Sequence, residues 1–254
     1  MRQDIDGALR GWHYKSETVQ ARLVRAKDGR ELLQMRIELG VMQLEVADRP
    51  DGSRPHGQAT YFAYLKAKAK AAELAGRNFR LNEQHSVEAD REFMQYYHRR
   101  VCWLSLGEYN RAVEDADHTL SFMDFVRDHS PSEEFTRSHE QYRGFVLFHR
   151  TQAAAAAFAT ADDPESAIDS IRVGFGKIES FLTNFDADAE PDSDPMLMQL
   201  RRLEAEIRER HNLGETLQEK LDRAIASEDY EAAAQLRDSI RQKSEPRTVE
   251  SEEA

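Results

Sequence analysis

The sequence predicts a mostly α-helical protein, with a small antiparallel β-meander at its N-terminal end, a helical bundle in the middle and a helical hairpin at its C-terminal end. Three observations lead to this fold class. Apolar residues alternate between residues 18 and 46, which is typical of strands. Nearly every segment after residue 57 has helical spacing or high helix propensity. An acidic stretch with two prolines, residues 186–195, predicts a linker ahead of the last quarter of the chain.

The first segment, residues 1–57, is predicted to be rich in β-structure. Its alternating apolar positions are Val19, Ala21 and Leu23 in one run and Leu33, Met35, Ile37 and Leu39 in the next. The Asp28–Gly29 pair between these runs favours a hairpin turn. Beyond Gly40 the alternation changes phase, and this fits either a bulge at Gly40 or a tight turn into a third strand.

A polar loop follows the predicted strands, because residues 49–57 hold two prolines and two glycines. Asp51 and His56 bring an acid and an imidazole into this loop, beside the end of a strand. One interpretation is an enzyme active site or small-ligand site around residues 48–57. The other is a solvated loop held by its turns.

Residues 58–185 are predicted to form the helical bundle. The alanine and lysine run at residues 66–72 favours a helix over about 58–75, and four longer helices follow with breaks at Gly107, at Ser130–Pro131 and at 162–164. The alanines at 153–157 predict a close approach of a neighbouring helix. Five phenylalanines at helical spacings are expected in the core, namely Phe122, Phe125, Phe145, Phe148 and Phe158.

One stretch of the bundle resembles the second half of a tetratricopeptide repeat. Its matching residues are Gly107, Tyr109, Ala112, Ala116 and Leu120, and a weaker copy runs through Asp162, Pro164, Ala167, Ile171 and Gly174. Two copies fall short of the roughly three that a stable repeat array needs. We therefore expect a tetratricopeptide-like bundle, and an ordinary bundle remains the alternative.

An aromatic and basic stripe on the same region is a candidate binding surface. His98, Arg99 and Trp103 could line a concave face that holds a peptide or ligand, as helical repeats do. The alternative is core packing of the aromatic residues, with Arg99 and its neighbour Arg100 in solvent.

After the linker, residues 196–242 are predicted to form a short coiled-coil-like helix and a helical hairpin. The helix carries an apolar stripe at Met196, Leu200, Leu203 and Ile207. Residues 243–254 are expected to be a disordered acidic tail. Residues 186–254 hold 19 of the 47 acids and only 10 of the 35 bases.

The hairpin sequence from Leu217 to Ile240 resembles the UVR motif, a short helical hairpin found in UvrB, in UvrC, and in McsA-type and Clp-associated proteins. The points of match are Leu221, Ala224, Asp229, Tyr230, Glu231, Ala233, Ala234, Leu236, Arg237, Asp238 and Ile240. One departure is Lys243, where the family often has leucine. About 30 residues are covered, so neither excision repair nor protease regulation follows from the resemblance alone.

The resemblance implies a role in docking a protein partner. Apolar stripes at Leu217, Leu221 and Ile225 and at Tyr230, Ala233, Leu236 and Ile240, together with Arg237, are the candidate binding residues. Two helices of this size bury too little apolar surface to be stable alone. The hairpin is therefore expected to bind another UVR hairpin or a second copy of the chain.

Composition restricts the remaining functions. A net charge of −12 has the wrong sign for a general nucleic-acid or membrane binder, and the only cysteine, Cys102, rules out a multi-thiolate zinc site. No catalytic, metal or cofactor site is predicted, and Cys102 is expected to be a buried thiol. The sequence indicates a cytoplasmic adaptor or scaffold without enzymatic activity. The alternatives are the small-ligand site above and an accessory factor of UvrB/UvrC-type excision repair or of a Clp-type protease.

Overall fold

The computed structural model describes residues 4–185 and 190–244, and within them the chain is mostly α-helical, as predicted. The strands are β1 (Ala21–Arg25), β2 (Glu31–Ile37) and β3 (Gly40–Glu45). The helices are α1 (Asp6–Leu9), α2 (Tyr61–Leu74), α3 (Glu83–Leu106), α4 (Tyr109–Asp128), α5 (Glu133–Glu140), α6 (Arg143–Thr160), α7 (Pro164–Phe185), α8 (Pro195–His211), α9 (Leu217–Ala226) and α10 (Tyr230–Ser244). Two 3-10 turns, Pro55–Gly57 and Pro191–Ser193, precede α2 and α8.

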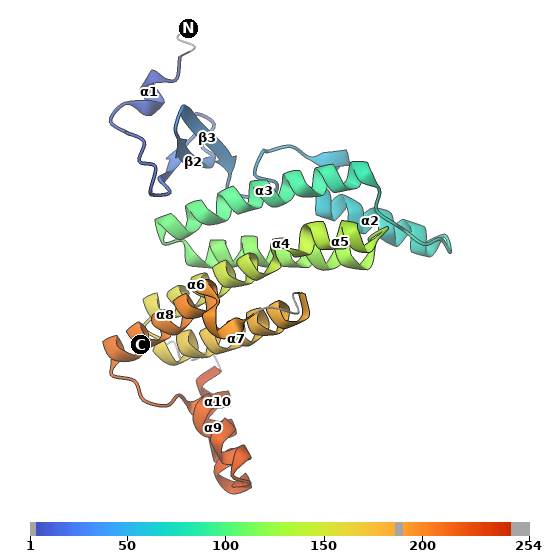
Figure 1. The fold of residues 1–254 in the computed structure, drawn as a ribbon. Coiled ribbons are helices and arrows are strands. Elements are labelled where there is room, and N and C mark those ends of the chain that lie inside the picture. Colours follow the sequence, from blue (N-terminus) through green and yellow to red (C-terminus); the bar gives the residue numbers. More distant parts are fainter. Residues whose placement is uncertain (1–3, 186–189, 245–254) are drawn as a thin grey trace, which may run out of the picture.

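The elements are stacked largely in chain order (Figure 1). The sheet lies over α3, α3 packs on α4, α4 on α6, α6 on α7, and α7 on α8. Helices α9 and α10 pack on each other and project from the far side of this stack. We call the stack from β1 to α8 the body and the pair α9–α10 the hairpin.

The β-meander has the predicted antiparallel order β1-β2-β3. Gly40 pairs with Ile37 across a two-residue turn, so the change of phase marks a tight turn into a third strand and not a bulge. Leu33 pairs with Leu44, and both are buried with Trp103 against α3. One face of the sheet is thus part of the core.

The predicted helix breaks are present, and one further break was not predicted. Gly107 ends α3 in the left-handed conformation, with a φ of 74°. The segment expected to run unbroken from 132 to 161 divides into α5 and α6. At the division the Gln141 side-chain amide donates a hydrogen bond to the Ser138 carbonyl at 2.7 Å. The amide of Tyr142 then bonds to His139 instead of Ser138, which tightens the turn.

The closest helix crossing lies between α6 and α7. Ala155 of α6 is fully buried against Ala167 and Ile168 of α7, while Ala153 is buried on another side of α6, with Trp103 and Ala112. On α7, a Cβ atom added at Gly174 would lie 2.0 Å from the Thr151 Oγ1 atom. Only glycine fits at this point, because any larger residue would overlap the Thr151 side chain.

Helix α8 packs on α7 and α6, whereas the sequence analysis grouped it with the hairpin. Leu197, Leu200 and Ile207 are buried in the same cluster as Ile168 and Ile171 of α7. Helix α8, which follows the predicted linker at 186–195, therefore shares the core of the bundle. Residues 186–189 of that linker, and residues 245–254 of the predicted acidic tail, lie outside the described residues.

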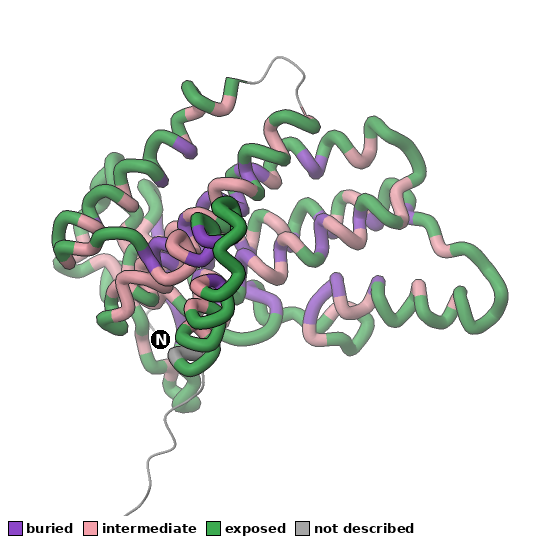
Figure 2. Tube along the Cα trace, turned by 90° about the horizontal axis from the view of Figure 1, so that it is seen from below, coloured by how far each residue is buried: buried purple, intermediate pink, exposed green. Residues whose placement is uncertain are grey.

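Burial follows the facing sides of the body helices, while the hairpin is exposed over most of its length (Figure 2). Phe122 and Phe148 are in the core as expected and Phe125 is partly buried. Phe145 and Phe158 are 40% and 41% exposed, which corrects their assignment to the core. Cys102 is fully buried, and burial raises the pKa of its thiol to about 12. In the described part of the chain, no helix is long and apolar enough to cross a membrane.

Candidate functional site

The loop at residues 48–57 keeps its two candidate residues apart. The Asp51 carboxylate accepts hydrogen bonds from the Ser53 amide and from Gln95 Nε2, both at 2.9 Å. Partial burial opposes its charged form, but the hydrogen bond from Ser53 lowers the pKa of Asp51 overall. His56 is exposed and stacks on the Tyr64 ring at 4.0 Å. The loop residues are thus used in turns and packing.

Arg49, a residue of the same loop, anchors the loop to α3. Its guanidinium is buried and lies within 4 Å of Asp51, Glu88 and Glu92. Glu92 is fully buried and accepts hydrogen bonds from the first amides of α2, at Tyr61 and Phe62. A carboxylate at a helix N-terminus with a buried arginine beside it is a balanced structural cluster.

The predicted surface at His98, Arg99 and Trp103 lies largely inside the protein. Trp103 is fully buried under the sheet, and His98 is half-buried. Arg99 is buried and pairs with Asp115 at 2.7 Å, and it donates hydrogen bonds to the carbonyls of Glu45 and Asp48. These residues join the sheet to α3 and α4. They do not form an open binding face, and neither Arg99 nor Arg100 is solvated.

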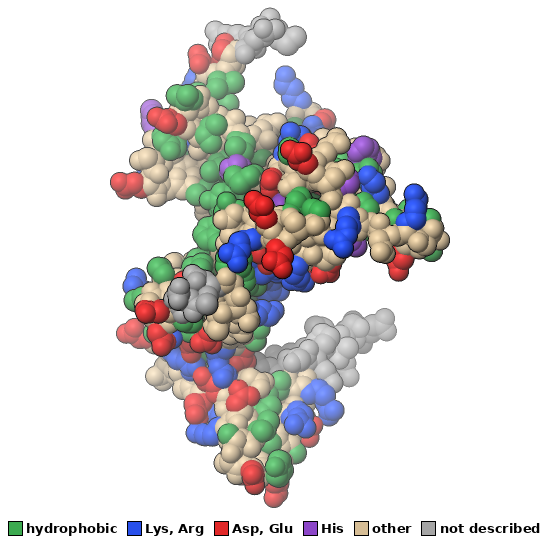
Figure 3. Space-filling model, turned by 45° about the vertical axis from the view of Figure 1, so that its right-hand side comes forward, with side chains coloured by type: hydrophobic (Ala, Val, Ile, Leu, Met, Phe, Trp, Pro, Cys, Tyr) green, Lys and Arg blue, Asp and Glu red, His purple; other side chains and the backbone are tan. Residues whose placement is uncertain are grey.

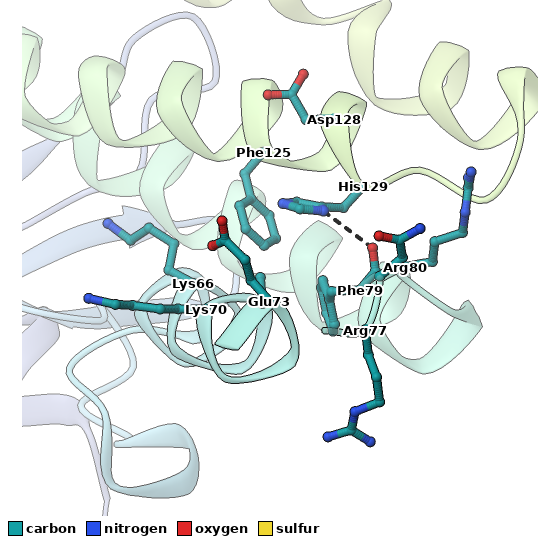
Figure 4. A pocket seen from close by; sticks show the side chains of 11 residues that line it. Lys66, Lys70, Glu73, Arg77, Phe79, Arg80, Phe125, Asp128 and His129 are labelled. Atoms are coloured by element: carbon teal, nitrogen blue, oxygen red, sulfur yellow. Dashed lines mark hydrogen bonds between the residues drawn. The ribbon is translucent and has the colours of Figure 1, made fainter. Parts of the chain in front are cut away.

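A basic pocket of about 620 Å³ lies between α2 and the end of α4 (Figure 4). Its walls include Lys66, Lys70, Arg77 and Arg80. Figure 4 shows that Lys66 and Lys70 point to one side while the Arg77 guanidinium points away from them. Its floor is filled by Phe125 and His129, whose rings are 4.3 Å apart. These cations do not converge on one point, so the pocket lacks the geometry of an anion site.

Within the described residues, no group of three or more His, Cys, Asp or Glu side chains could hold a metal ion.

The C-terminal hairpin is built around a very small interior. Leu221 and Ala224 of α9 and Ala233 of α10 are its buried residues, with Ala232, Leu236 and Ile240 partly buried beside them. Alanines at the crossing let the two helices approach closely. Asp229 caps the second helix, because its Oδ1 accepts a hydrogen bond from the Ala232 amide at 3.0 Å.

Two large apolar side chains near the tip of the hairpin point outward. Ile225 is 46% exposed at the end of α9, and Tyr230 is 70% exposed at the start of α10. Arg237 is exposed further along α10. Figure 3 shows apolar side chains along the hairpin surface between acidic and basic ones. Together, Ile225 and Tyr230 form what we call the apolar tip.

A polar junction attaches the base of the hairpin to α7 and α8. Thr216, which is fully buried, donates a hydrogen bond to Asp169 at 3.1 Å and caps α9 together with Glu219. Arg208 bonds to Glu219 at 2.6 Å, and Arg172 to Asp222 at 3.2 Å. Burial raises the pKa of Asp169, whereas the pKa of Glu219 is lowered, because the hydrogen bond from Thr216 and the pairing with Arg208 outweigh its burial.

The family comparison matches this part of the chain. Residues 213–245 match the family described as UvrB/uvrC motif. The hairpin is a UVR motif. No curated protein and no solved structure shows a significant match to the chain. The matched segment begins ahead of Thr216 and includes the apolar tip and the hairpin's side of the junction, whereas Asp169, Arg172 and Arg208 lie outside it.

Sequence reasoning located the UVR hairpin, but it did not separate the apolar residues that face the interior of the hairpin from those that face outward. Leu221, Ala233, Leu236 and Ile240 face the other helix of the hairpin, while Ile225 and Tyr230, assigned to the same stripes, face outward. Leu217 is half-buried near the junction. The junction itself was missed. Its sequence signal is Thr216 followed three residues later by Glu219, the pattern of a capping box.

Proposed function

We propose that this protein is a non-enzymatic adaptor that binds another UVR hairpin through the apolar tip of its own. The partner hairpin belongs either to a second copy of the chain or to a UVR-containing protein of the UvrB or UvrC type. The observation that carries the proposal is the exposure of Ile225 and Tyr230 on a segment that matches the UVR motif.

The energetics of the hairpin support this proposal. With three buried residues, the hairpin interior contributes little hydrophobic free energy, so association is the expected source of further stability. Ile225 and Tyr230 lie on either side of the turn at 227–229, at the opposite end of α9 from the polar junction. A partner can therefore cover the apolar tip without displacing the body. Tyrosine is among the residue types enriched at binding hot spots.

The test changes the apolar tip and leaves the hairpin interior intact. The full chain carrying Ile225→Asp and Tyr230→Asp is compared with the wild type by sedimentation velocity, alone and mixed with UVR hairpins from a UvrB-type and a UvrC-type protein. The matched control places the same two charges at Gln235 and Ser239, which are exposed on α10. We expect the wild type and the control to associate with themselves or with one of the hairpins, and the tip variant to stay monomeric.

Equal association of the wild type and the tip variant would contradict the proposal, as would a wild type that associates with none of these partners. Leu221→Asp is not a suitable test. Leu221 is buried inside the hairpin, so its charge would unfold the hairpin whatever the binding face is. Circular dichroism of the tip variant shows whether the helices are retained.

A further inference from the structure

A second cavity, of about 470 Å³, lies in the body between α3, α4, α5 and α6. Its size is within the range of small-molecule sites. Helix α3 supplies Asp90, Phe93, Met94, Tyr97 and Arg100, and α4 supplies Thr119 and Met123. The division between α5 and α6 supplies the opposite wall, with His139, Tyr142 and Phe145. The unpredicted break at 141–142 therefore helps to shape this cavity.

Arg100 is the unusual residue of the cavity, because its guanidinium is buried without an acid. The residue is 1% exposed. Its Nη1 atom lies 3.3 Å from Thr119 Oγ1, and its Nε atom lies 3.4 Å from His149 Nδ1. Among the described residues, no carboxylate is within ion-pair distance of it. Asp115 favours the charge of Arg100 from further away but is itself bound by Arg99.

The charge of Arg100 is therefore retained but poorly compensated. Burial lowers the pKa of Arg100 to about 10, so the guanidinium is still protonated at neutral pH. Burial and the nearby Arg100 lower the pKa of His149 to about 4. His149 is therefore neutral at neutral pH and does not compensate the positive charge of Arg100. A buried, uncompensated cation is costly, and proteins normally pair one with an anion.

Most of the remaining lining is apolar and reaches the surface, and Asp90, Thr119, Ser138 and His139 are its other polar residues. Met94, Tyr142 and Phe145 are 52%, 58% and 40% exposed, and all three line the cavity. The second charged group, Asp90, is largely exposed and lies 3.1 Å from His139 Nε2. The cavity offers an apolar, partly aromatic entrance and one unpaired cation inside.

We propose that this cavity binds a small organic acid, with its carboxylate on Arg100 and its apolar part against Met94, Tyr142 and Phe145. Arginine binds a carboxylate through two parallel hydrogen bonds, and the low dielectric of the interior strengthens them. The apolar entrance selects a carboxylate that carries a hydrocarbon or aromatic group. This site is separate from the UVR hairpin, so it adds a small-molecule function to the adaptor.

The test uses two pairs of probes on the full chain. The acids are 3-phenylpropanoate and hexanoate, and their primary amides have the same shape without the charge. Isothermal titration calorimetry and thermal unfolding measure binding, since a ligand of the folded state raises the melting temperature. We expect at least one of the acids to bind at millimolar concentrations, and its amide to bind at least about tenfold more weakly.

Two variants test whether the acids bind at Arg100. Arg100→Met removes the buried charge and keeps the length of the side chain, so we expect folding to be retained or improved and the binding of the acids to be lost. Arg91→Met removes an exposed arginine from the same helix and should leave binding unchanged. The proposal is overturned if neither acid binds, if the amides bind as well as the acids, or if Arg100→Met binds them like the wild type.

Discussion

In the body, Ile168, Ile171 and Leu200 are at most 1% exposed, whereas the buried residues of the UVR hairpin, Leu221, Ala224 and Ala233, keep between 3% and 8% of their surface in solvent. The body joins five long helices and a sheet through contiguous apolar clusters. The hairpin joins the body through ion pairs and hydrogen bonds at its base. The body is therefore expected to be stable by itself, and the hairpin to be a weaker unit whose stability depends on its junction and on its partner.

The largest effect is expected at the α6–α7 crossing of the body. Gly174→Ala places a methyl group where Thr151 already lies, so the free energy of unfolding should fall by about 3 kcal/mol. The control is Gly176→Ala, two residues away on the same helix, where no atom lies within 4 Å of an added Cβ. It should be neutral or stabilising by up to about 1 kcal/mol. Urea unfolding followed by circular dichroism measures both variants. Equal urea midpoints for the two variants would show that the α6–α7 crossing has room for a methyl group at residue 174.

The second effect tests whether the hairpin unfolds separately from the body. Leu221→Ala removes the largest side chain of the hairpin interior and should lower the local stability of α9 and α10 by about 2 kcal/mol. Hydrogen exchange read by mass spectrometry should show faster exchange in the hairpin and unchanged exchange in α6 and α7. Ile225→Ala, at the exposed tip, is the control with little effect. If α6 and α7 also exchange faster, then hairpin and body form one cooperative unit.

Acid is expected to weaken the body through His149. The unfolded chain protonates this histidine near its ordinary pKa of 6.5, but the folded chain does so only near 4. The contribution of the neutral imidazole to the free energy of unfolding is therefore fully present above about pH 6.5 and is lost as the pH falls toward 4. Between pH 7 and pH 5 the loss is about 2 kcal/mol. His149→Gln should remove that part of the pH dependence, and His13→Gln, at an exposed position, should retain it. An identical slope in all three proteins would contradict this role.

The sequence predicted the elements whose signals are local. Alternation located the strands, Gly107 and Pro164 located helix ends, and a dense local match located the UVR hairpin. Periodicity did not decide which of two adjacent apolar residues faces inward. The positions Leu221 and Ile225 fit a stripe, but the crossing buries Leu221 and Ala224 and leaves Ile225 exposed.

The candidate site in the body was beyond sequence reasoning for a different reason. Arg99 and Arg100 were expected in solvent, since a charged side chain is rarely buried. Their burial depends on partners distant in the sequence, such as Asp115 for Arg99 and Thr119 and His149 for Arg100. At the break between α5 and α6 the Gln141 side chain donates a hydrogen bond to the Ser138 carbonyl, a contact that no composition rule predicts.

The smallest effect is expected at the junction, and it separates attachment of the hairpin from its internal packing. Thr216→Val removes the cap of α9 and the hydrogen bond to Asp169, so the hairpin should lose about 1 kcal/mol of local stability. Ser227→Ala, an exposed position at the other end of α9, is the control and should change stability by less than about 0.5 kcal/mol. Hydrogen exchange of the hairpin amides measures both changes.

The same variant has a second readout at Asp169, which stays on α7 when the hairpin loosens. Burial already raises the pKa of Asp169, and the hydrogen bond from Thr216 is one of the contacts that lower it. If the hairpin stays docked in Thr216→Val, burial remains and the donor is gone, so the pKa of Asp169 should move further up. If the hairpin detaches, Asp169 becomes hydrated and its pKa should fall toward that of an exposed aspartate. Titration of the Asp169 carboxyl by NMR distinguishes a weakened junction from a released one.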